Sequence, residues 1–521
     1  MNQTVEYNAA IKNGIGRMAF VVLSMLAEYL ALFLFFRYLG NHTAIAMELT
    51  HILAAVLVLY IYGKHMTPSM KIPWIIVIIA LPIFGTTLYL LIGLNGSTYK
   101  MRRKYKEIDQ ALLPFLKADR QIYEEAKKRD ARLANLLRYI YRNAGYPAYD
   151  DTKIDYYDDA KKGIEAQKKE LAKAQKFIFM EYHAIEDAQS WHEIEDVLTD
   201  RVNHGVEVRV FYDDMGSIGF IDTDFVRKME SRGIKCKVFN AFAPGMNIFL
   251  NNRDHRKITV IDGKVGFTGG YNLANEYFHL TEPFGFWKDT GVRLEGSAVN
   301  ALTVTFLEMW NAVAGEDEED REFDRYLLPQ AEISSGAGQN GFVQPYADSP
   351  LDDIAVGEDV YISMAELATD YVWYITPYLI ITDEMNHALS LAAKRGVDVR
   401  IVTPGIPDKK IIYSVTRSYY NGLVRNGVRI FEYTPGFCHA KMSIADDLAA
   451  TCGTINMDYR SLYHHFENGC LFADCEAVGE VRADFERVFE ESKEVTDHYK
   501  SGRGAFLRVG QMLLRLIAPL L

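Results

Sequence analysis

The stretch HRKITVID at residues 255–262 decides the fold of this chain, because it returns as HAKMSIAD at residues 439–446. In both copies a lysine follows the histidine two positions later, and an aspartate ends the motif. Small residues and an asparagine then follow, in TGGYN at residues 268–272 and in GTIN at residues 453–456. Recurrence at matched spacing indicates two repeated halves within one fold.

The segments upstream of the two motifs match as well. In each half a strand-like run, a helical stretch and a second strand-like run follow one another: FIFMEYH (177–183) with GVEVRVF (205–211), and YVWYITPY (371–378) with GVDVRIV (396–402). Strand-like runs that alternate with helical ones predict an α/β layered fold. We expect a first half over residues 151–330 and a second half over residues 331–500, joined by an acidic and polar linker.

The spacing of the motif brings its first two side chains together. In a strand, residues two apart point to the same face, so we expect His255 to project with Lys257, and His439 with Lys441. A lysine supplies positive charge that can hold a phosphate, and a neighbouring histidine supplies a nucleophile or a proton. These four residues are therefore candidate catalytic residues for chemistry at a phosphodiester.

The asparagines and aspartates of the two copies have different expected roles. The amide groups of Asn272 and Asn456 can donate hydrogen bonds to phosphoryl oxygens, so both are candidate phosphate-binding residues. Asp262 and Asp446 are candidate catalytic residues as members of the motif. Asp262 with Gly263 is also a good two-residue hairpin turn, so a structural role stays equally open.

Each histidine also needs a carboxylate on its other ring nitrogen, which fixes the orientation of the ring. Two downstream acids are candidates for this supporting role: Asp289 in WKDT and Glu467 in FEN. Surface acids are common, so a role at the surface is the alternative for both.

Apolar residues crowd into the start of the chain, in runs over residues 18–36, 44–62 and 72–94. Each run is near the roughly 20 residues that a helix needs to cross a bilayer. We expect a membrane domain over residues 1–98 with two to three transmembrane helices. A cleaved signal peptide is the alternative for the first run. The basic segment KMRRKYK at residues 100–106 favours a cytoplasmic catalytic part in a multi-pass cell-membrane protein.

Two further segments complete the predicted organisation. Residues 99–150 are charged and helix-prone, and we interpret them as a juxtamembrane helical connector. Residues 501–521 predict a C-terminal amphipathic helix, which could lie on the membrane or dock onto the protein's own core.

Composition excludes some classes of function. The formal net charge of -12 argues against a protein that binds nucleic acid by neutralising many phosphates. The five cysteines form no C-x-x-C pair, which suits a reducing compartment. Cys438 stands beside His439 and could be a reactive thiol or a small buried neighbour. The sequence contains no recognisable zinc or magnesium ligand motif.

Over roughly residues 165–500 the sequence resembles the phospholipase D superfamily, whose signature is H-x-K-x4-D. Within that superfamily it is similar to bacterial cardiolipin synthases. The matching segments include PIFGTTLYLLIG (82–93), NRDHRK (252–257), TPY (376–378), RSYY (417–420) and NMDYRS (456–461). It departs from them in the extra apolar run at residues 18–36, because such synthases usually have two spans.

The resemblance implies a pseudo-twofold α/β fold in which both motifs meet at one site between two halves, each a mixed β-sheet flanked by helices. It implies that His255 attacks phosphorus and forms a covalent intermediate, while His439 acts as the general acid and base. Lysines and asparagines would hold the phosphoryl oxygens, and because the lysines already supply positive charge, no metal and no cofactor would be needed. It also places Glu181, Tyr378 and Arg417 near strand ends that could face the site.

The implied reaction transfers a phosphatidyl group from one phosphatidylglycerol to another, which gives cardiolipin and glycerol. The expected partners are phosphatidylglycerol and membrane lipid, with no nucleic acid. The oligomeric state is left open. Three alternatives remain: a phospholipase D that uses water, a transferase that uses another alcohol, and a membrane-tethered nuclease.

Overall fold

The computed structural model describes residues 44–64, 67–90, 96–241, 252–314, 320, 322–328 and 341–500, with a few isolated positions near the two ends. Most of the first apolar run, most of the predicted linker and most of the predicted C-terminal amphipathic helix lie outside the described residues.

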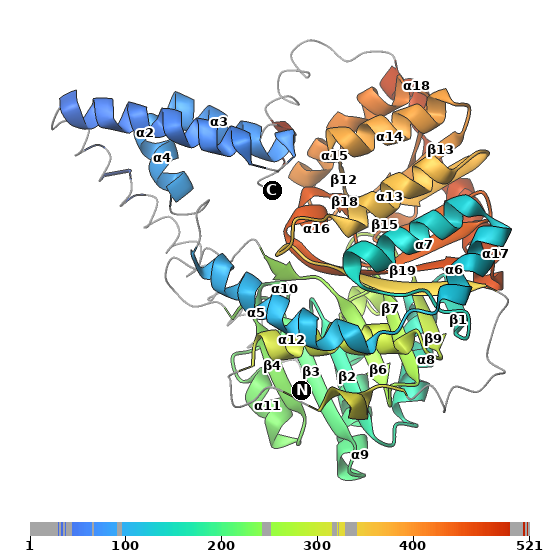
Figure 1. Ribbon diagram of the computed structural model, residues 1–521. Helices are drawn as coiled ribbons and strands as arrows, with labels where there is room; N and C mark the ends of the chain where they lie inside the picture. The colour runs from blue at the N-terminus through green and yellow to red at the C-terminus, as the bar shows by residue number, and fades with distance from the viewer. Residues whose placement is uncertain are drawn as a thin grey trace.

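Two mixed β-sheets with the same strand order form the body of the protein (Figure 1). The first sheet has the order β1-β9-β7-β6-β2-β3-β4. Its strands are β1 (Lys153–Tyr157), β2 (Phe177–Tyr182), β3 (Glu207–Asp213), β4 (Lys235–Phe239), β6 (Lys257–Ile261), β7 (Val265–Gly269) and β9 (Gly291–Glu295). Parallel pairing joins β2, β3 and β4, and antiparallel pairing joins the remaining strands.

The second sheet repeats this order as β10-β19-β17-β16-β11-β13-β14, with β20 added at its edge. Its strands are β10 (Phe342–Asp348), β11 (Tyr371–Ile375), β13 (Asp398–Pro404), β14 (Arg429–Tyr433), β16 (Met442–Ala445), β17 (Ala449–Gly453), β19 (His465–Ala473) and β20 (Ser492–Glu494). Each strand of the first sheet thus corresponds to one strand of the second. The predicted α/β fold of two repeated halves, each with a mixed sheet, is confirmed.

Helices cover both sheets because their apolar residues recur with helical spacing. In the first half these are α8 (Ala160–Leu171), α9 (Gln189–Asn203), α11 (Phe225–Ser231) and α12 (Val299–Ala312). In the second half they are α13 (Val356–Leu367), α14 (Asp383–Lys394), α15 (Lys410–Val424) and α17 (Glu476–Glu490). Helix α12 contacts both the first sheet and β10 of the second sheet, and it crosses the middle of the molecule in Figure 1.

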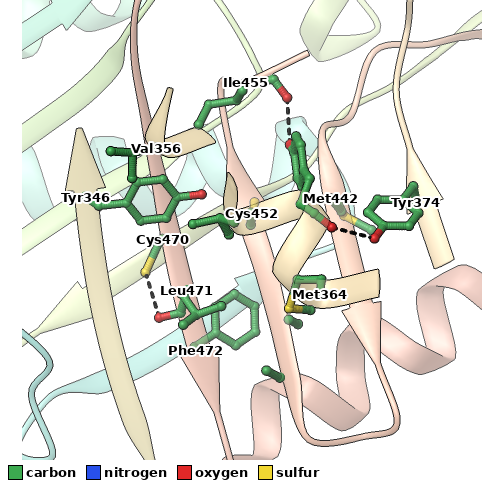
Figure 2. Packing of buried hydrophobic residues seen from close by; sticks show 14 of the residues in the cluster. Tyr346, Val356, Met364, Tyr374, Met442, Cys452, Ile455, Cys470, Leu471 and Phe472 are labelled. Carbon is green, nitrogen blue, oxygen red and sulfur yellow. Dashed lines mark hydrogen bonds between the residues drawn. The ribbon is translucent and has the colours of Figure 1, made fainter. Parts of the chain in front are cut away.

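The core of the second half shows how tightly the layers pack. Figure 2 shows Tyr346 of β10 beside Val356 of α13, with Cys452 and Cys470 from neighbouring strands. The hydroxyl groups of two buried tyrosines in this layer bind backbone oxygens: Tyr361 donates to Ile455 at 2.7 Å, and Tyr374 donates to Tyr361 at 2.8 Å. These two buried hydroxyl groups are thus paired, as a dry core requires.

The third N-terminal apolar run forms shorter helices than expected, whereas the second forms one helix of the expected length. The second run forms α2 (Ala44–Gly63), but the third forms α3 (Pro68–Ala80) and α4 (Pro82–Leu88). The expectation of one continuous helix over residues 72–94 is therefore wrong. Pro82 explains the break, because a proline disfavours helical geometry at the preceding residue, and Leu81 has φ -134° and ψ 70°.

None of the helices in the described ranges is both long enough and apolar enough to cross a bilayer. Helices α2, α3 and α4 pack against one another through a small apolar cluster of Ala54, Leu57, Ile61, Ile78 and Tyr89. In Figure 1 they lie beside the two-sheet body.

The predicted connector is more closely joined to the body than expected. It contains α5 (Gly96–Leu112), α6 (Arg120–Arg129) and α7 (Ala131–Ala144). Helix α5 contacts α12, and α7 contacts α13 and β10. Buried residues of all three helices, such as Tyr105, Ala126 and Leu137, belong to the main hydrophobic core. These helices are therefore part of the folded body.

Two short strands cross between the halves. Strand β5 (Arg253–Asp254) comes from the first half and pairs in parallel with β19 of the second half. Strand β15 (Gly436–Cys438) comes from the second half and pairs in parallel with β8 (Phe286–Lys288) of the first. Because each crossing strand directly precedes one motif histidine, the exchange brings both motifs to the interface between the halves.

Candidate active site

His255 lies between β5 and β6, and its ring is held by a residue of the other half. Its Nδ1 atom is 2.9 Å from Oε2 of Glu467, on β19. Its backbone N–H donates to the carbonyl oxygen of Phe466 at 2.9 Å. The sequence predicted a strand through the whole motif, but regular pairing resumes only at Lys257. Residues 255 and 256 lie between β5 and β6, so His255 directly continues the crossing strand β5.

His439 repeats this arrangement from the opposite side. It follows β15, and its Nδ1 atom is 2.6 Å from Oδ2 of Asp289, which follows β8. Its backbone N–H donates to the carbonyl oxygen of Lys288 at 2.8 Å. Both carboxylates are fully buried. The two acids proposed from sequence do contact the histidines, and each acid comes from the half that does not supply its histidine.

The small residues after the first motif make room for one of these carboxylates. A Cβ atom at Gly270 would lie 2.1 Å from Oδ1 of Asp289. Such a distance is far below a normal contact, so a larger residue at this position would displace the acid that orients His439. The absence of a side chain at Gly270 therefore makes room for the Asp289 carboxylate.

The two motif lysines lie beside their histidines and are almost completely buried. Lys257 Nζ donates to the backbone oxygen of His255, and Lys441 Nζ lies 3.1 Å from Nε2 of His439. Burial lowers the pKa of Lys257 to about 7 and that of Lys441 to about 8, although nearby carboxylates oppose the effect. Binding of an anion between them would restore their full charge.

Electrostatic interactions join the two motifs into one site. Burial and the charges of Lys257 and Lys441 lower the pKa of His255 well below its usual value. Burial lowers the pKa of His439 to about 4, and Lys441 and Lys257 contribute to the shift. Each histidine thus responds to the lysine of the other half. Burial alone would raise the pKa of Asp289, but Lys441 and His439 outweigh it and lower that pKa.

The two asparagines are buried, but they are not equivalent. Asn272 accepts a hydrogen bond from the Ala184 amide at 3.2 Å and donates to the Tyr277 hydroxyl at 2.9 Å. Oδ1 of Asn456 is buried without a hydrogen-bond partner in the described part of the chain. Their role as phosphate ligands stays a prediction.

Asp262 and Asp446 do not lie with the histidines, which corrects their prediction as catalytic residues. The carboxylate of Asp262 accepts from the amides of residues 175, 176 and 177, just before β2. Asp446 accepts from the amides of residues 369, 370 and 371, just before β11. Strand β6 separates Asp262 from Lys257 by roughly 16 Å at about 3.3 Å per residue. Asp262 thus links the end of β6 to the start of β2, and Asp446 links the end of β16 to the start of β11.

Sequence comparison places this geometry in a known family. The profile described as "Cardiolipin synthase, PLD-like domain" matches residues 168–310 and 361–489, one segment in each half. A second profile, "Phospholipase_D-nuclease N-terminal", matches residues 52–93. The chain is also 34% identical to "Cardiolipin synthase 2" of Bacillus cereus over 467 residues, which is 89% of each protein.

The chain belongs to the cardiolipin synthase family of the phospholipase D superfamily. It is also 30% identical to a "Cardiolipin synthase" of Alkalihalophilus pseudofirmus over 98% of this chain and all of that protein. It is 43% identical to an uncharacterised protein of Streptococcus mutans over 89% of this chain.

A solved structure of phosphatidylserine synthase from Haemophilus influenzae shares the fold of this cardiolipin synthase family member. The TM-score is 0.54 at 14% identity, over 74% of this chain and 97% of that chain. At this identity the likeness concerns the fold alone.

Sequence reasoning missed several residues around the motif histidines. The rings of His183 and His465 lie 4.9 Å and 5.5 Å from that of His255, measured between ring centroids. The rings of Tyr277 and Trp287 lie 5.3 Å and 5.6 Å from that of His439. Alternation along strands could have identified two of them, because His465 and Trp287 precede Glu467 and Asp289 by two positions.

One group of side chains near His255 has the composition of a metal site. His255, His465 and Glu467 offer ligand atoms within 4.8 Å of one another, a donor set that zinc uses in enzymes. Lys257 and Lys441 place positive charge beside this group, which favours an anion over a divalent cation.

The remaining sequence candidates have other partners. Arg417 forms two hydrogen bonds with Glu432, each 2.9 Å long. Tyr378 donates to Asp408 at 2.5 Å. Glu181 is fully buried, and burial followed by the Asp254 charge raises its pKa well above the usual value. The thiol of Cys438 is buried, which raises its pKa to about 12 and fits the inert alternative.

Proposed function

We propose that this protein transfers a phosphatidyl group from one phosphatidylglycerol to the terminal hydroxyl of another, which yields cardiolipin and glycerol. The observation that carries the proposal is the pair of buried imidazoles, each bound to a carboxylate of the opposite half, with two buried lysines beside them. Such a site can hold one phosphate and supply a nucleophile and a proton donor to it.

In the first step His255 acts as the nucleophile. The N–H at Nδ1 of the imidazole donates to Glu467, so the lone pair that attacks phosphorus is on Nε2. The new N–P bond forms as the bond from phosphorus to the glycerol oxygen breaks. A protonated His439 gives its proton to that oxygen, so glycerol leaves as a neutral alcohol. In the free site the pKa of His439 is about 4, so the imidazolium forms mainly in the substrate complex, where Asp289 and the bound phosphodiester anion both stabilise it.

In the second step the roles reverse at the same atoms. The neutral His439 takes the proton from the terminal hydroxyl of the second phosphatidylglycerol, and the oxygen attacks phosphorus. The N–P bond breaks, His255 regains its lone pair and His439 is again protonated. Lys257 and Lys441 neutralise the phosphoryl oxygens in both steps. A water molecule in place of the second lipid would give phosphatidic acid.

The lipid substrate is supported by the apolar N-terminal segments as well as by the family. Helix α2 is 20 residues long, and most of its large apolar side chains from Leu49 to Tyr62 are exposed. We include in the proposal that the N-terminal region holds the enzyme at the cell membrane in more than one pass, with the catalytic body on the cytoplasmic side.

Reconstitution of the full chain into vesicles of labelled phosphatidylglycerol tests the function. Formation of cardiolipin with an equal amount of glycerol supports the proposal. Phosphatidic acid as the sole product would show a phospholipase D, and inertness toward the lipid would refute both activities. The variant His255→Ala must lose turnover under either lipid activity, and retained turnover would refute the shared site.

A further inference from the structure

The two ends of the active site correspond in topology, but they differ in chemistry. At the His255 end, strand register places Arg253 of β5 directly opposite His465 of β19. These residues lie two positions before His255 and Glu467, so they continue the same faces of the two strands. Arg253 is 4% exposed and donates to the Asn240 carbonyl oxygen at 3.4 Å. Nδ1 of His465 lies 3.5 Å from Oε1 of Glu467, and Nε2 has no hydrogen-bond partner among the described residues. This end is cationic and polar.

At the His439 end the corresponding positions are aromatic. Strand register places Phe437 of β15 opposite Trp287 of β8, and their ring centroids are 4.8 Å apart. Both rings lie within 6 Å of the His439 ring, at 5.8 Å and 5.6 Å. Tyr277 covers the same imidazole at 5.3 Å. This end offers apolar surface, with no counterpart of the arginine at the other end.

A second arginine strengthens the cationic end. Arg460 is half-buried on α16 (Tyr459–Tyr463), and no carboxylate in the described ranges lies within ion-pair distance of its guanidinium. It lies next to the strand pair in the fold, because its backbone oxygen accepts from the amide of His464, the neighbour of His465, at 2.9 Å. Burial lowers the pKa of Arg253 and of His465; Asp213 and Glu467 oppose the shifts, and the charge of Arg460 adds to both. Like charges held together inside a protein indicate a place for an anion.

The carboxylates nearest to these arginines are already engaged. Asp213 lies 3.5 Å from Arg253, and its two oxygens accept from the amides of Gly216 and Asp254. Asp458 accepts from the Ser461 amide at 2.9 Å. Burial raises the pKa of Asp213 to about 7, so this carboxyl group is only partly charged near neutrality, and raises the pKa of Asp458 to about 6. Asp214 and Asp254, also buried, add further negative charge near Arg253.

We propose that Arg253, Arg460 and His465 form a second anion subsite, which binds the phosphodiester of the second lipid while the first phosphodiester reacts at His255. The inference rests on the proposed function. It adds the residues by which the enzyme would select a lipid as the acceptor. Residues two apart on a strand are separated by about 7 Å. Two phosphates joined by a three-carbon glycerol bridge, as in the product, can span such a distance.

A second phosphate group distinguishes a phosphatidylglycerol acceptor from a neutral alcohol. Water, glycerol and simple alcohols can reach the phosphatidyl-enzyme without any cationic subsite, because they carry no charge. The subsite therefore affects partition of the intermediate between a lipid acceptor and a neutral acceptor. Formation of the intermediate needs only the first phosphate and is common to both products.

Competition between two acceptors measures this partition directly. The full chain in phosphatidylglycerol vesicles, supplied with 1-butanol, forms cardiolipin and phosphatidylbutanol from the same intermediate. In Arg460→Gln we expect the ratio of cardiolipin to phosphatidylbutanol to fall by about ten-fold or more, the effect of losing one charged hydrogen bond. His465→Asn is the second variant if Arg460→Gln does not fold, and it should lower the ratio in the same direction.

Arg482→Gln is the matched control, because Arg482 lies on α17 and pairs with Asp447 and Glu486 at the surface. It should leave the ratio unchanged. An unchanged ratio in Arg460→Gln and His465→Asn, or an equal fall in both products, would overturn the subsite while the proposed function stands. Phosphatidylbutanol without any cardiolipin from the unaltered protein would overturn the proposed function and the subsite together.

Discussion

Each motif histidine depends on one buried carboxylate, which orients the ring and stabilises its charged form. We predict that Asp289→Asn and Glu467→Gln each lower kcat by about 10²- to 10⁴-fold, because an amide no longer favours the required tautomer and charge. Steady-state transfer assays on the purified variants check this. A fall below three-fold in either variant would contradict the assigned role.

Asp262→Asn is the control for these variants, since Asp262 also accepts hydrogen bonds but lies away from the site. Loss of charge-assisted bonds to three amides should lower the free energy of unfolding by about 1–3 kcal/mol. Thermal unfolding measures this loss. The kcat of the folded variant should stay close to that of the unaltered protein, and a loss as large as that of Asp289→Asn would restore Asp262 as a catalytic residue.

The lowered pKa values of the two lysines predict an alkaline limit to substrate capture. The pKa of Lys257 is about 7 and that of Lys441 is about 8. Each lysine is charged when the pH is below its pKa and loses its proton as the pH rises through that value. Because a bound phosphate stabilises the charged forms, kcat/KM should decline above these values, whereas kcat should decline only at higher pH. Rate profiles from about pH 6 to about pH 10, the range below the usual lysine pKa, test the prediction. A flat kcat/KM would contradict it.

The exchanged strands are the elements that assemble the site, and Gly436 in β15 makes one exchange possible. A Cβ atom at this position would lie 2.3 Å from the backbone oxygen of Phe286 on the partner strand. We predict that Gly436→Ala separates β15 from β8 and lowers kcat by about 10²-fold or more, since a small misplacement of catalytic groups has effects of this size.

Gly479→Ala is the matched control for the strand variant. Gly479 lies in α17, and a Cβ atom there would meet nothing within 4 Å. This change should preserve kcat and stabilise the helix by about 1 kcal/mol, which thermal unfolding can measure. Equal kcat in both alanine variants would show that β15 does not position His439.

Different elements were predictable from the sequence to different degrees. Motif spacing sufficed to pair His255 with Lys257 and to predict two repeated α/β halves, because repetition and alternation are local properties. Spacing could not reveal that β5 and β15 pair with the opposite half, since that pairing joins residues far apart in the chain. The break at Leu81 was predictable in principle from Pro82. The continuous apolar character of residues 72–94 favoured one spanning helix instead, because spanning helices tolerate proline.

At the scale of the whole molecule, helix α5 links the N-terminal region to the site. Arg256, between the first motif's histidine and lysine, donates to the Tyr105 hydroxyl of α5 at 3.0 Å and to the backbone oxygen of Glu467 at 3.4 Å. Arg256 is fully buried, so the bond to Tyr105 holds α5 to the first half and the bond to Glu467 holds the two halves together.

We predict that Tyr105→Phe lowers the free energy of unfolding by about 1–3 kcal/mol and lowers kcat, because a buried guanidinium loses an acceptor. Tyr146→Phe is the control, since the Tyr146 hydroxyl contacts Glu308 but not Arg256. The control should lose stability without a matching loss of kcat. Calorimetry with transfer assays separates the two, and equal kcat in both variants would contradict a link from α5 to the site.

The unequal ends of the active site have a consequence for ancestry. A symmetric dimer of identical subunits would place every residue twice, so an arginine beside one histidine would recur beside the other. Fusion of two such copies into one chain removes this constraint, so that Arg253 in one half can correspond to Phe437 in the other. The exchanged strands β5 and β15 then correspond to the former contact between subunits. The two ends of the active site could become different only after duplication, when each copy could change independently.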